Sequence, residues 1–521
     1  MAADWIARGI ANTGIVDVGG TAAELASRGA TSGSSGGPNG AAAGGAAALQ
    51  ALARDAKAGI VISGAYYRQG DSVLFQADFT DAAAGKLVQS VGPVSASASA
   101  PLDGVERLRQ RVIGSLAPLV DSTLAGLATA TSRPPTMEAY REFLIGEDLF
   151  YKDGRAAIPH FVRAASLDST YLYPLLRVVG IYGNMRDGRA VDSLTRIIDR
   201  KRALLSSYEQ AYLEFTRSCT TLSNPPVCLR AARQMVALAP SSQFAAYVLA
   251  VAEAFNQNPR AVDSILTALD PEGGALRGRI YFYYYWAMAK HWLGDHPREL
   301  QIAQRARVLH PTRLYLYDTE IRALAALGRA REVDARVTEA LSMAQDLERR
   351  AAQVAAGAVF ELRAHGFPAA AEALGARLLI WAAARPAEIV HSHAGRRDLA
   401  VLLSAAHDWE ALQGVADSLV AAAPDDLRHL RWQGVAFAMR GRRAEADGVV
   451  RRIERGDHRL SGGEDVRARA TILAALGEKS RAMSLMRVSI GNYDDSEAHG
   501  SLLFDMMDGY PPFLEFFKPR G

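Results

Sequence analysis

Residues 280–311 read IYFYYYWAMAKHWLGDHPRELQIAQRARVLHP, an apolar run and an amphipathic run joined by a short polar turn. Tyr283 and Ala287 recur in the first run at the spacing of one helix face. Gly294 follows that run, and glycine readily adopts the left-handed backbone conformation that a tight turn after a helix needs. Pro311 ends the second run because proline cannot continue a helix. The stretch therefore predicts two helices that fold back on one another.

The same pattern recurs at a regular distance along the chain. Gly328 lies 34 residues after Gly294 (328 − 294), and related turns occur at Gly441 and Gly477. This interval and the small residues at the packing positions resemble the tetratricopeptide repeat, a helix-turn-helix unit. One hairpin cannot bury its apolar face alone, so at least three must stack. The resemblance predicts a mainly α protein, with about nine or ten hairpins in a superhelical solenoid over residues 137–490.

A different pattern precedes the helices. Residues 63–88, SGAYYRQGDSVLFQADFTDAAAGKLV, carry apolar side chains at alternate positions, and turn-forming residues surround Gly70 and Gly85. This arrangement predicts three antiparallel strands. An amphipathic helix over residues 102–119 follows them. Together they predict a small α/β domain over residues 1–125 with a mainly antiparallel sheet.

Two segments read as irregular. Residues 28–46 are low in complexity and consist mainly of Gly, Ala and Ser, which cannot bury enough apolar area to offset their ordering entropy. We expect this loop to be mobile. Residues 126–136 contain paired prolines that disfavour helix, and they are predicted to link the first domain to the hairpins.

The segment 63–88, followed by an amphipathic helix, resembles the TolB-like module that precedes tetratricopeptide arrays in bacterial serine/threonine kinases, adenylate cyclases and transcriptional regulators. Members of that family open with an apolar strand, whereas this chain begins with the helical pattern AADWIARGIA. The resemblance implies an alternative to a stand-alone scaffold, namely the regulatory tail of a kinase or cyclase whose catalytic domain lies upstream. A stand-alone protein would be cytoplasmic, and a preceding membrane helix would place this region outside the cytoplasm.

The C-terminal segment 491–521 is rich in phenylalanine. It resembles the closing segment of the same signalling proteins, and its aromatic side chains are expected to cover the exposed face of the last hairpin. The residues predicted to form this cap are Phe504, Phe513, Phe516 and Phe517.

Cys219 and Cys228 are the only cysteines, and they flank the turn-like stretch TTLSNPPV. Two alternatives remain open from the sequence. Both thiols could lie in a helical core, or they could form a disulfide across a loop between antiparallel helices.

Composition and motifs limit the function classes. The net formal charge is only +3, so there is no basic excess to bind nucleic acid. The longest uncharged stretch, residues 29–53, is too weakly hydrophobic to span a membrane. No phosphate-binding loop, kinase catalytic segment or nucleophile elbow occurs, so no enzyme activity and no cofactor are predicted. His391 and His393 lack a third ligand at fixed spacing, and no metal site is predicted.

The best candidate for function is a second face of the aromatic helix. In the tetratricopeptide family that face lines the concave groove, which implies a protein or extended peptide as the ligand. Aromatic rings bring rigid contact area and arginines bring bidentate pairing, so an acidic peptide fits best. The alternative is a helix that is apolar all round because its neighbours bury it. The predicted groove residues are Tyr281, Tyr284, Met288, His291, Tyr315, Asp318, Arg322, Arg428, Arg431 and Arg467.

Overall fold

The structure is a computed structural model of the 521-residue chain. It describes residues 2–11, 18, 53–54, 56–120, 135–150, 153–185, 187–221, 224–273, 276–343, 350–458, 461, 463–488, 499–516 and 518. The predicted mobile loop at 28–46 and the predicted cap residue Phe517 lie outside these ranges.

The chain divides into two compact units. The first consists of Met1–Val178, Lys201–Glu209 and Gly273–Arg277, and the second contains the rest of the chain. The first unit therefore includes a helical hairpin as well as the sheet. The sequence predicts a boundary at residues 126–136 instead, and that boundary remains a prediction.

A three-stranded antiparallel sheet forms the first part of the first unit, with the order β1-β2-β3. Its strands are β1 (Ile60–Gln69), β2 (Ser72–Asp81) and β3 (Leu87–Ser97). The two connecting turns contain Gly70 and Gly85, with φ of 59° and 63°. Glycine tolerates such a positive φ without steric strain. Both turns therefore lie at the glycines where the sequence predicts them.

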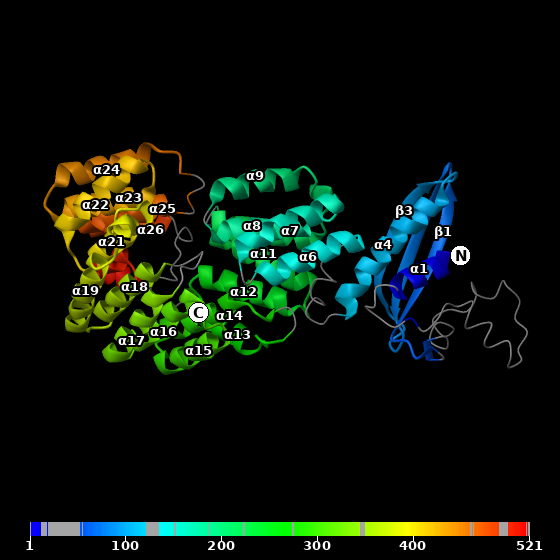
Figure 1. Ribbon diagram of the computed structural model, residues 1–521, viewed down its shortest axis with the longest axis horizontal. Coiled ribbons are helices and arrows are strands. Elements are labelled where there is room, and N and C mark those ends of the chain that lie inside the picture. Colours follow the sequence, from blue (N-terminus) through cyan, green and yellow to red (C-terminus); the bar gives the residue numbers. More distant parts are fainter. Residues whose placement is uncertain are drawn as a thin grey trace, which may run out of the picture. The chain divides into compact units, whose positions relative to one another are not determined.

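One face of the sheet is covered by α4 (Pro101–Val120), which in turn contacts α1 (Ala2–Ala11). Figure 1 shows α4 running alongside the strands. Phe75, Ala77 and Phe79 of β2 are buried, as their alternation predicts. Gly104 permits the close approach of the helix, since a Cβ atom there would lie 2.6 Å from Cε2 of Phe75.

The first helical hairpin consists of α6 (Met137–Phe150) and α7 (Gly154–Leu167), which pack against one another. Phe161 of α7 is fully buried against Gly146 of α6, where a Cβ atom would lie 2.6 Å from its ring. The small residue on one helix thus makes room for the large residue on the other.

Helices dominate the rest of the chain. In chain order they are α8 (Tyr173–Asn184), α9 (Gly188–Asp199), the 3-10 turn η2 (Arg202–Leu204), α10 (Ser207–Thr216), the π-helical turn η3 (Arg217–Thr221), α11 (Pro225–Leu238), α12 (Gln243–Phe255), α13 (Pro259–Thr267), α14 (Ile280–Trp292), α15 (His296–Leu309), α16 (Leu314–Ala326), α17 (Ala330–Ser342), α18 (Ala351–Ala364), α19 (Pro368–Ala383), α20 (Ala387–Val390), α21 (His393–Ala405), α22 (Trp409–Ala422), α23 (Leu427–Met439), α24 (Arg443–Arg455), α25 (Glu464–Ala475), α26 (Lys479–Val488), α27 (Leu502–Met507) and α28 (Pro511–Phe516).

In the second unit these helices form stacked hairpins. The pairs α14/α15, α16/α17, α18/α19, α21/α22, α23/α24 and α25/α26 each pack together, and the first helices α12, α14, α16 and α18 contact one another in turn. Figure 1 shows α14, α16 and α18 side by side. The four turn glycines Gly294, Gly328, Gly441 and Gly477 have φ between 69° and 80°, which confirms their predicted role. The fold is therefore mainly α, with tetratricopeptide-like hairpins and a small antiparallel sheet.

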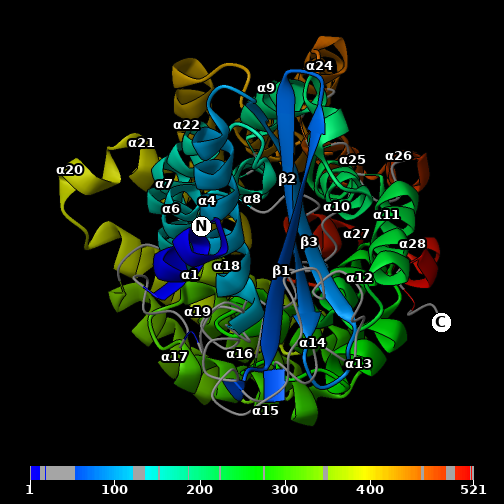
Figure 2. The same ribbon diagram turned by 90° about the vertical axis from the view of Figure 1, so that its right-hand side faces the viewer.

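The C-terminal helices pack on the last hairpin. Phe504, Phe513 and Phe516 share one hydrophobic cluster with residues of α25 and α26. This cluster covers apolar surface on the final pair of helices, which a hairpin array needs at its end. Figure 2 shows α27 and α28 near α25 and α26 in the red part of the chain.

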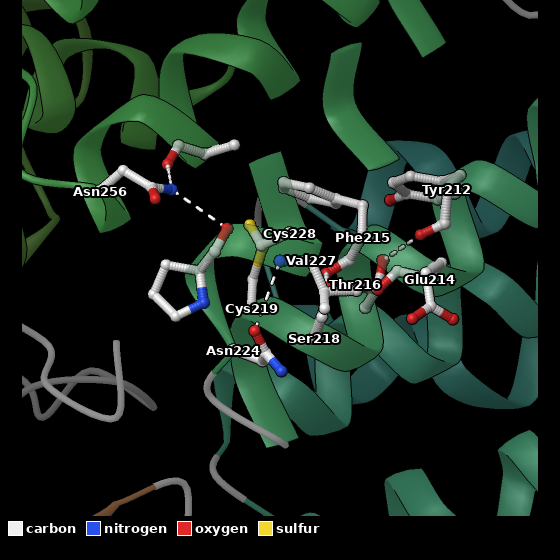
Figure 3. The surroundings of a disulfide bond; sticks show 12 residues. Tyr212, Glu214, Phe215, Thr216, Ser218, Cys219, Asn224, Val227, Cys228 and Asn256 are labelled. Atoms are coloured by element: carbon white, nitrogen blue, oxygen red, sulfur yellow. Dashed lines mark hydrogen bonds between the residues drawn. A yellow bond between two sulfur atoms is a disulfide. The ribbon is translucent and has the colours of Figure 1, made fainter. Parts of the chain in front are cut away.

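Cys219 and Cys228 form a disulfide, with their Cα atoms 5.3 Å apart. Figure 3 shows the bond joining η3 to α11, and both cysteines are buried. Asn224 accepts a hydrogen bond from the backbone N–H of Val227 and so caps α11 beside the bond. Of the two alternatives that the sequence leaves open, the structure contains the disulfide.

Within the described residues, the structure contains no helix of the length and apolar character that a membrane span requires.

Candidate functional site

The predicted groove residues on α14 are unequally exposed. Tyr281 is partly exposed, whereas Tyr284, Met288 and His291 are buried. Tyr315 of α16 is also partly exposed. Burial of the three inner residues agrees with the alternative that this helix is apolar all round because its neighbours cover it.

An aromatic group lies where α14 meets α16. The ring centroids of Tyr284 and Tyr315 are 4.4 Å apart, and those of Tyr281 and Tyr315 are 5.2 Å apart in an edge-to-face arrangement. Edge-to-face contacts place a positive ring edge on a negative ring face, which favours rigid packing. The structure thus brings together three of the residues that the sequence assigned to one surface.

Asp318 and Arg322 of α16 are buried, contrary to an open position in a groove. Nε of Arg322 lies 3.2 Å from Oε1 of Glu361, which belongs to α18. Burial opposes the charge of Arg322, but Glu361, Tyr284 and Asp318 outweigh it and raise the pKa of this guanidinium. Arg322 is therefore a charged residue inside the stack of hairpins.

Three predicted arginines form a separate group. Arg431 and Arg467 both pair with Glu464, at 2.9 Å and 3.7 Å, and both are only partly exposed. Arg428 pairs with Asp426 at 3.0 Å. Each guanidinium already faces a carboxylate, so an acidic ligand would compete with these intramolecular partners.

A group of histidines and glutamates is the most distinctive polar feature of the second unit. We call it the histidine–glutamate cluster, and its members are His291, His296, Glu299, Glu361, His365 and His499. They come from α14, α15, α18 with its C-cap, and the residues before α27.

The donor atoms of this cluster converge. Nε2 of His291 lies 2.8 Å from Nδ1 of His499 and 3.7 Å from Oε2 of Glu361. The same Glu361 oxygen lies 3.5 Å from Nε2 of His365 and 3.9 Å from Nδ1 of His499. Three imidazoles and one carboxylate therefore surround a common point.

Glu299 orients the first of these imidazoles. Its carboxylate lies 2.9 Å from Nδ1 of His291, and both side chains are almost completely buried. An ionised carboxylate only accepts hydrogen bonds, so Nδ1 carries a proton, and in the neutral form of the ring the lone pair is then on Nε2. Nδ1 of His296 lies 3.0 Å from Oε2 of Glu299, the same oxygen that His291 contacts at 2.9 Å.

Glu361 is fully buried, yet within the part of the chain that the structure describes neither of its oxygens makes a hydrogen bond of good geometry. Burial alone would raise its pKa, but His291, His365 and Arg322 outweigh burial and lower the pKa well below the usual range. Burial also lowers the pKa of His499 to about 3. The site thus holds an ionised carboxylate beside a neutral imidazole.

Sequence reasoning missed most of this cluster. The sequence pattern places only His291 in a site, because metal-ligand motifs are recognised by close spacing along the chain. Two local signals were present: Glu299 replaces the usual small residue of the repeat, and Glu361 and His365 lie four residues apart on one helix face. His499 has no local signal, since 208 residues separate it from His291.

Comparison with known proteins yields no matching family model and no matching curated protein. Among solved structures, the chain is similar to a tetratricopeptide repeat protein from Parabacteroides merdae ATCC 43184, at 13% identity and a TM-score of 0.26, over 58% of this chain and 99% of that one. It is also similar to a structure of Naa15/Naa10 bound to HypK-THB, at 13% identity and a TM-score of 0.20, over 80% of this chain and 65% of that one. At such low TM-scores, the fold rests on the observed hairpins themselves.

Proposed function

We propose that this protein is a non-enzymatic scaffold that binds a protein or extended peptide along the first helices of its hairpins. The observation that supports this proposal best is the contact between Tyr281 and Tyr315, which stay partly exposed although they come from successive hairpins. Rigid aromatic rings provide contact area at a low entropic cost, so such a pair suits an anchor position. An extended ligand crossing the hairpins would contact both rings.

Three arginines further along the hairpins would add positive charge to the proposed binding surface. Arg428, Arg431 and Arg467 would meet acidic groups of the ligand by exchanging their pairs with Asp426 and Glu464. Because these internal pairs must break first, we expect acidic groups to contribute selectivity more than affinity.

We further propose a role in bacterial signalling, either as a scaffold or as the regulatory tail of a serine/threonine kinase or cyclase. Support comes from the resemblance of residues 63–88 to the TolB-like module, and from three antiparallel strands followed by an amphipathic helix in the expected order. Reading the genomic DNA upstream of the first codon tests the tail: an in-frame kinase or cyclase signature supports it, and an immediate stop codon supports the scaffold.

Selection from a display library of extended peptides, followed by calorimetry with the selected peptide, tests the binding function. The double variant Tyr281→Ala/Tyr315→Ala should weaken the best peptide at least about 10-fold, as expected for loss of aromatic anchors. Tyr66→Ala is the control, because Tyr66 lies on β1 and is 76% exposed. Failure to select any peptide, or equal affinity for both variants, would overturn the proposed surface.

A further inference from the structure

We infer that the histidine–glutamate cluster is a binding site for a zinc-type divalent transition metal ion, with His291, Glu361, His365 and His499 as its ligands. This site is separate from the proposed peptide surface, and it differs from the sequence prediction that no metal binds. Spacing along the chain does not reveal these ligands, because they meet only through the stacking of the hairpins, and His291 and His499 are 208 residues apart.

The separations among the ligand atoms suit a tetrahedral ion. Zinc–nitrogen bonds of about 2.0–2.1 Å place the corners of a tetrahedron about 3.3–3.4 Å apart. The four ligand atoms all lie within 4.8 Å of one another, and the measured pairs span 2.8 Å to 3.9 Å around Nε2 of His291 and Oε2 of Glu361. These separations bracket the tetrahedral value, so side-chain shifts of up to about 1 Å would complete the coordination.

Two of the proposed ligands, His291 and Glu361, already have partners that orient them for coordination. Glu299 holds the proton of His291 on Nδ1, which directs the Nε2 lone pair toward the centre. Arg322 lies beside Oε1 of Glu361, at 3.2 Å, and leaves Oε2 directed to the three imidazoles. Metal-ligating histidines almost always donate their second ring N–H to such a partner.

A buried cation would also satisfy polar atoms of the cluster that lack hydrogen-bond partners among the described residues. Glu361 is fully buried with both oxygens lacking a good hydrogen bond, and Nε2 of His365 likewise lacks one within the described residues. A buried polar atom without a hydrogen-bond partner destabilises the folded state, because it has lost its contact with water. A metal ion would satisfy these atoms together, which a further hydrogen bond could not do.

The ligand types select the metal class. Three imidazole nitrogens favour zinc and its neighbours over magnesium or calcium, which prefer oxygen ligands. Four protein ligands leave no open position on a tetrahedral ion, which is typical of a structural site. The ion would then tie α14 and α18 to the segment that begins with His499, where Asp505 already pairs with Arg363 at 2.9 Å.

Titration of the chelator-stripped full chain with Zn²⁺, in competition with a chromophoric chelator, tests this site. We expect a 1:1 complex, a higher melting temperature with zinc, and the visible absorption of tetrahedral cobalt when Co²⁺ replaces Zn²⁺. Glu361→Gln and His499→Ala should each weaken zinc binding by more than about 100-fold, because removing only the hydrogen-bond partner of a ligand typically costs 10–100-fold.

His310→Ala is the matched control, because His310 lies at the end of α15 outside the cluster, and it should bind zinc as tightly as the wild type. His499 is 28% exposed, so His499→Ala should keep the wild-type circular dichroism even if Glu361→Gln does not fold. Absence of zinc binding by the wild type would overturn the inference, and so would unchanged affinity in a folded His499→Ala variant.

Discussion

Glu299 holds the imidazole of His291 in one tautomer, through a contact of 2.9 Å between two side chains that are each 1% exposed. Glu299→Gln should weaken zinc binding about 10–100-fold, because a glutamine amide can donate to Nδ1 and shift the proton to Nε2, where the ion must bind. Chelator competition measures the loss. Glu339→Gln, which changes a 43% exposed carboxylate, should leave the affinity unchanged. Equal affinities for both variants would contradict the orienting role of Glu299.

Gly434 of α23 packs closely against α25, and adding a single methyl group at this position should lower the stability of the protein. A Cβ atom at Gly434 would lie 2.5 Å from Cδ1 of Ile472, so Gly434→Ala should destabilise the second unit by about 1–3 kcal/mol. At Gly414 of α22 nothing lies within 4 Å of the added atom, and Gly414→Ala should be neutral or stabilise by about 0.5–1 kcal/mol. Denaturant unfolding of both variants measures the difference. Equal stabilities would show that the hairpins are not packed this closely.

The disulfide should contribute measurably to stability. Closing a loop between Cys219 and Cys228, nine residues apart, stabilises by about 2–3 kcal/mol in the chain-entropy description. Reductant should therefore lower the unfolding midpoint of the wild type and have no effect on Cys219→Ala/Cys228→Ala. Peptide mapping without reductant should recover the two cysteines in one linked fragment. Two free thiols in the folded protein would refute this prediction.

Asp426 should make stability depend on acid pH. Burial opposes its ionisation, but hydrogen bonds and charge from Arg428 prevail and lower its pKa to about 2. Since this pKa is below the unfolded value near 3.9, the ionised form stabilises the native state above about pH 4, and this contribution is lost as the pH falls toward 2.

The contribution should be about 1–2 kcal/mol, because Arg428 is 43% exposed and solvent screens the pair. Asp426→Asn should therefore be less stable than the wild type at pH 7, with a difference that shrinks between pH 4 and pH 2. Arg428→Gln removes the other partner of this ion pair, so its stability should show the same pH dependence as that of Asp426→Asn. If the difference in unfolding free energy between wild type and Asp426→Asn stays constant with pH, the lost stability comes from the role of Asp426 as the N-cap of α23 and not from its charge.

The local elements of this protein can be predicted from its amino-acid sequence alone. The turn glycines from Gly294 to Gly477 and the alternation of Phe75, Ala77 and Phe79 are local signals, because a left-handed turn and a half-buried strand each depend on a few adjacent residues. The hairpin repeat and the three-stranded sheet follow from them. The choice between free thiols and a disulfide remained open, because it depends on the distance between two helices.

Which side chains come into contact depends on how the helices stack, and the sequence does not reveal it. The sequence predicts that Arg322 faces a groove, because helical spacing gives the direction of a side chain on its own helix. Helical spacing does not show which neighbouring helix covers that side chain. In the structure α18 covers Arg322 and places Glu361 against its guanidinium. His291 and His499 carry no joint signal along the chain, yet their nitrogens lie 2.8 Å apart. Periodicity is a property of single elements, whereas a site made from α14, α18 and the C-terminal segment exists only after the hairpins have stacked.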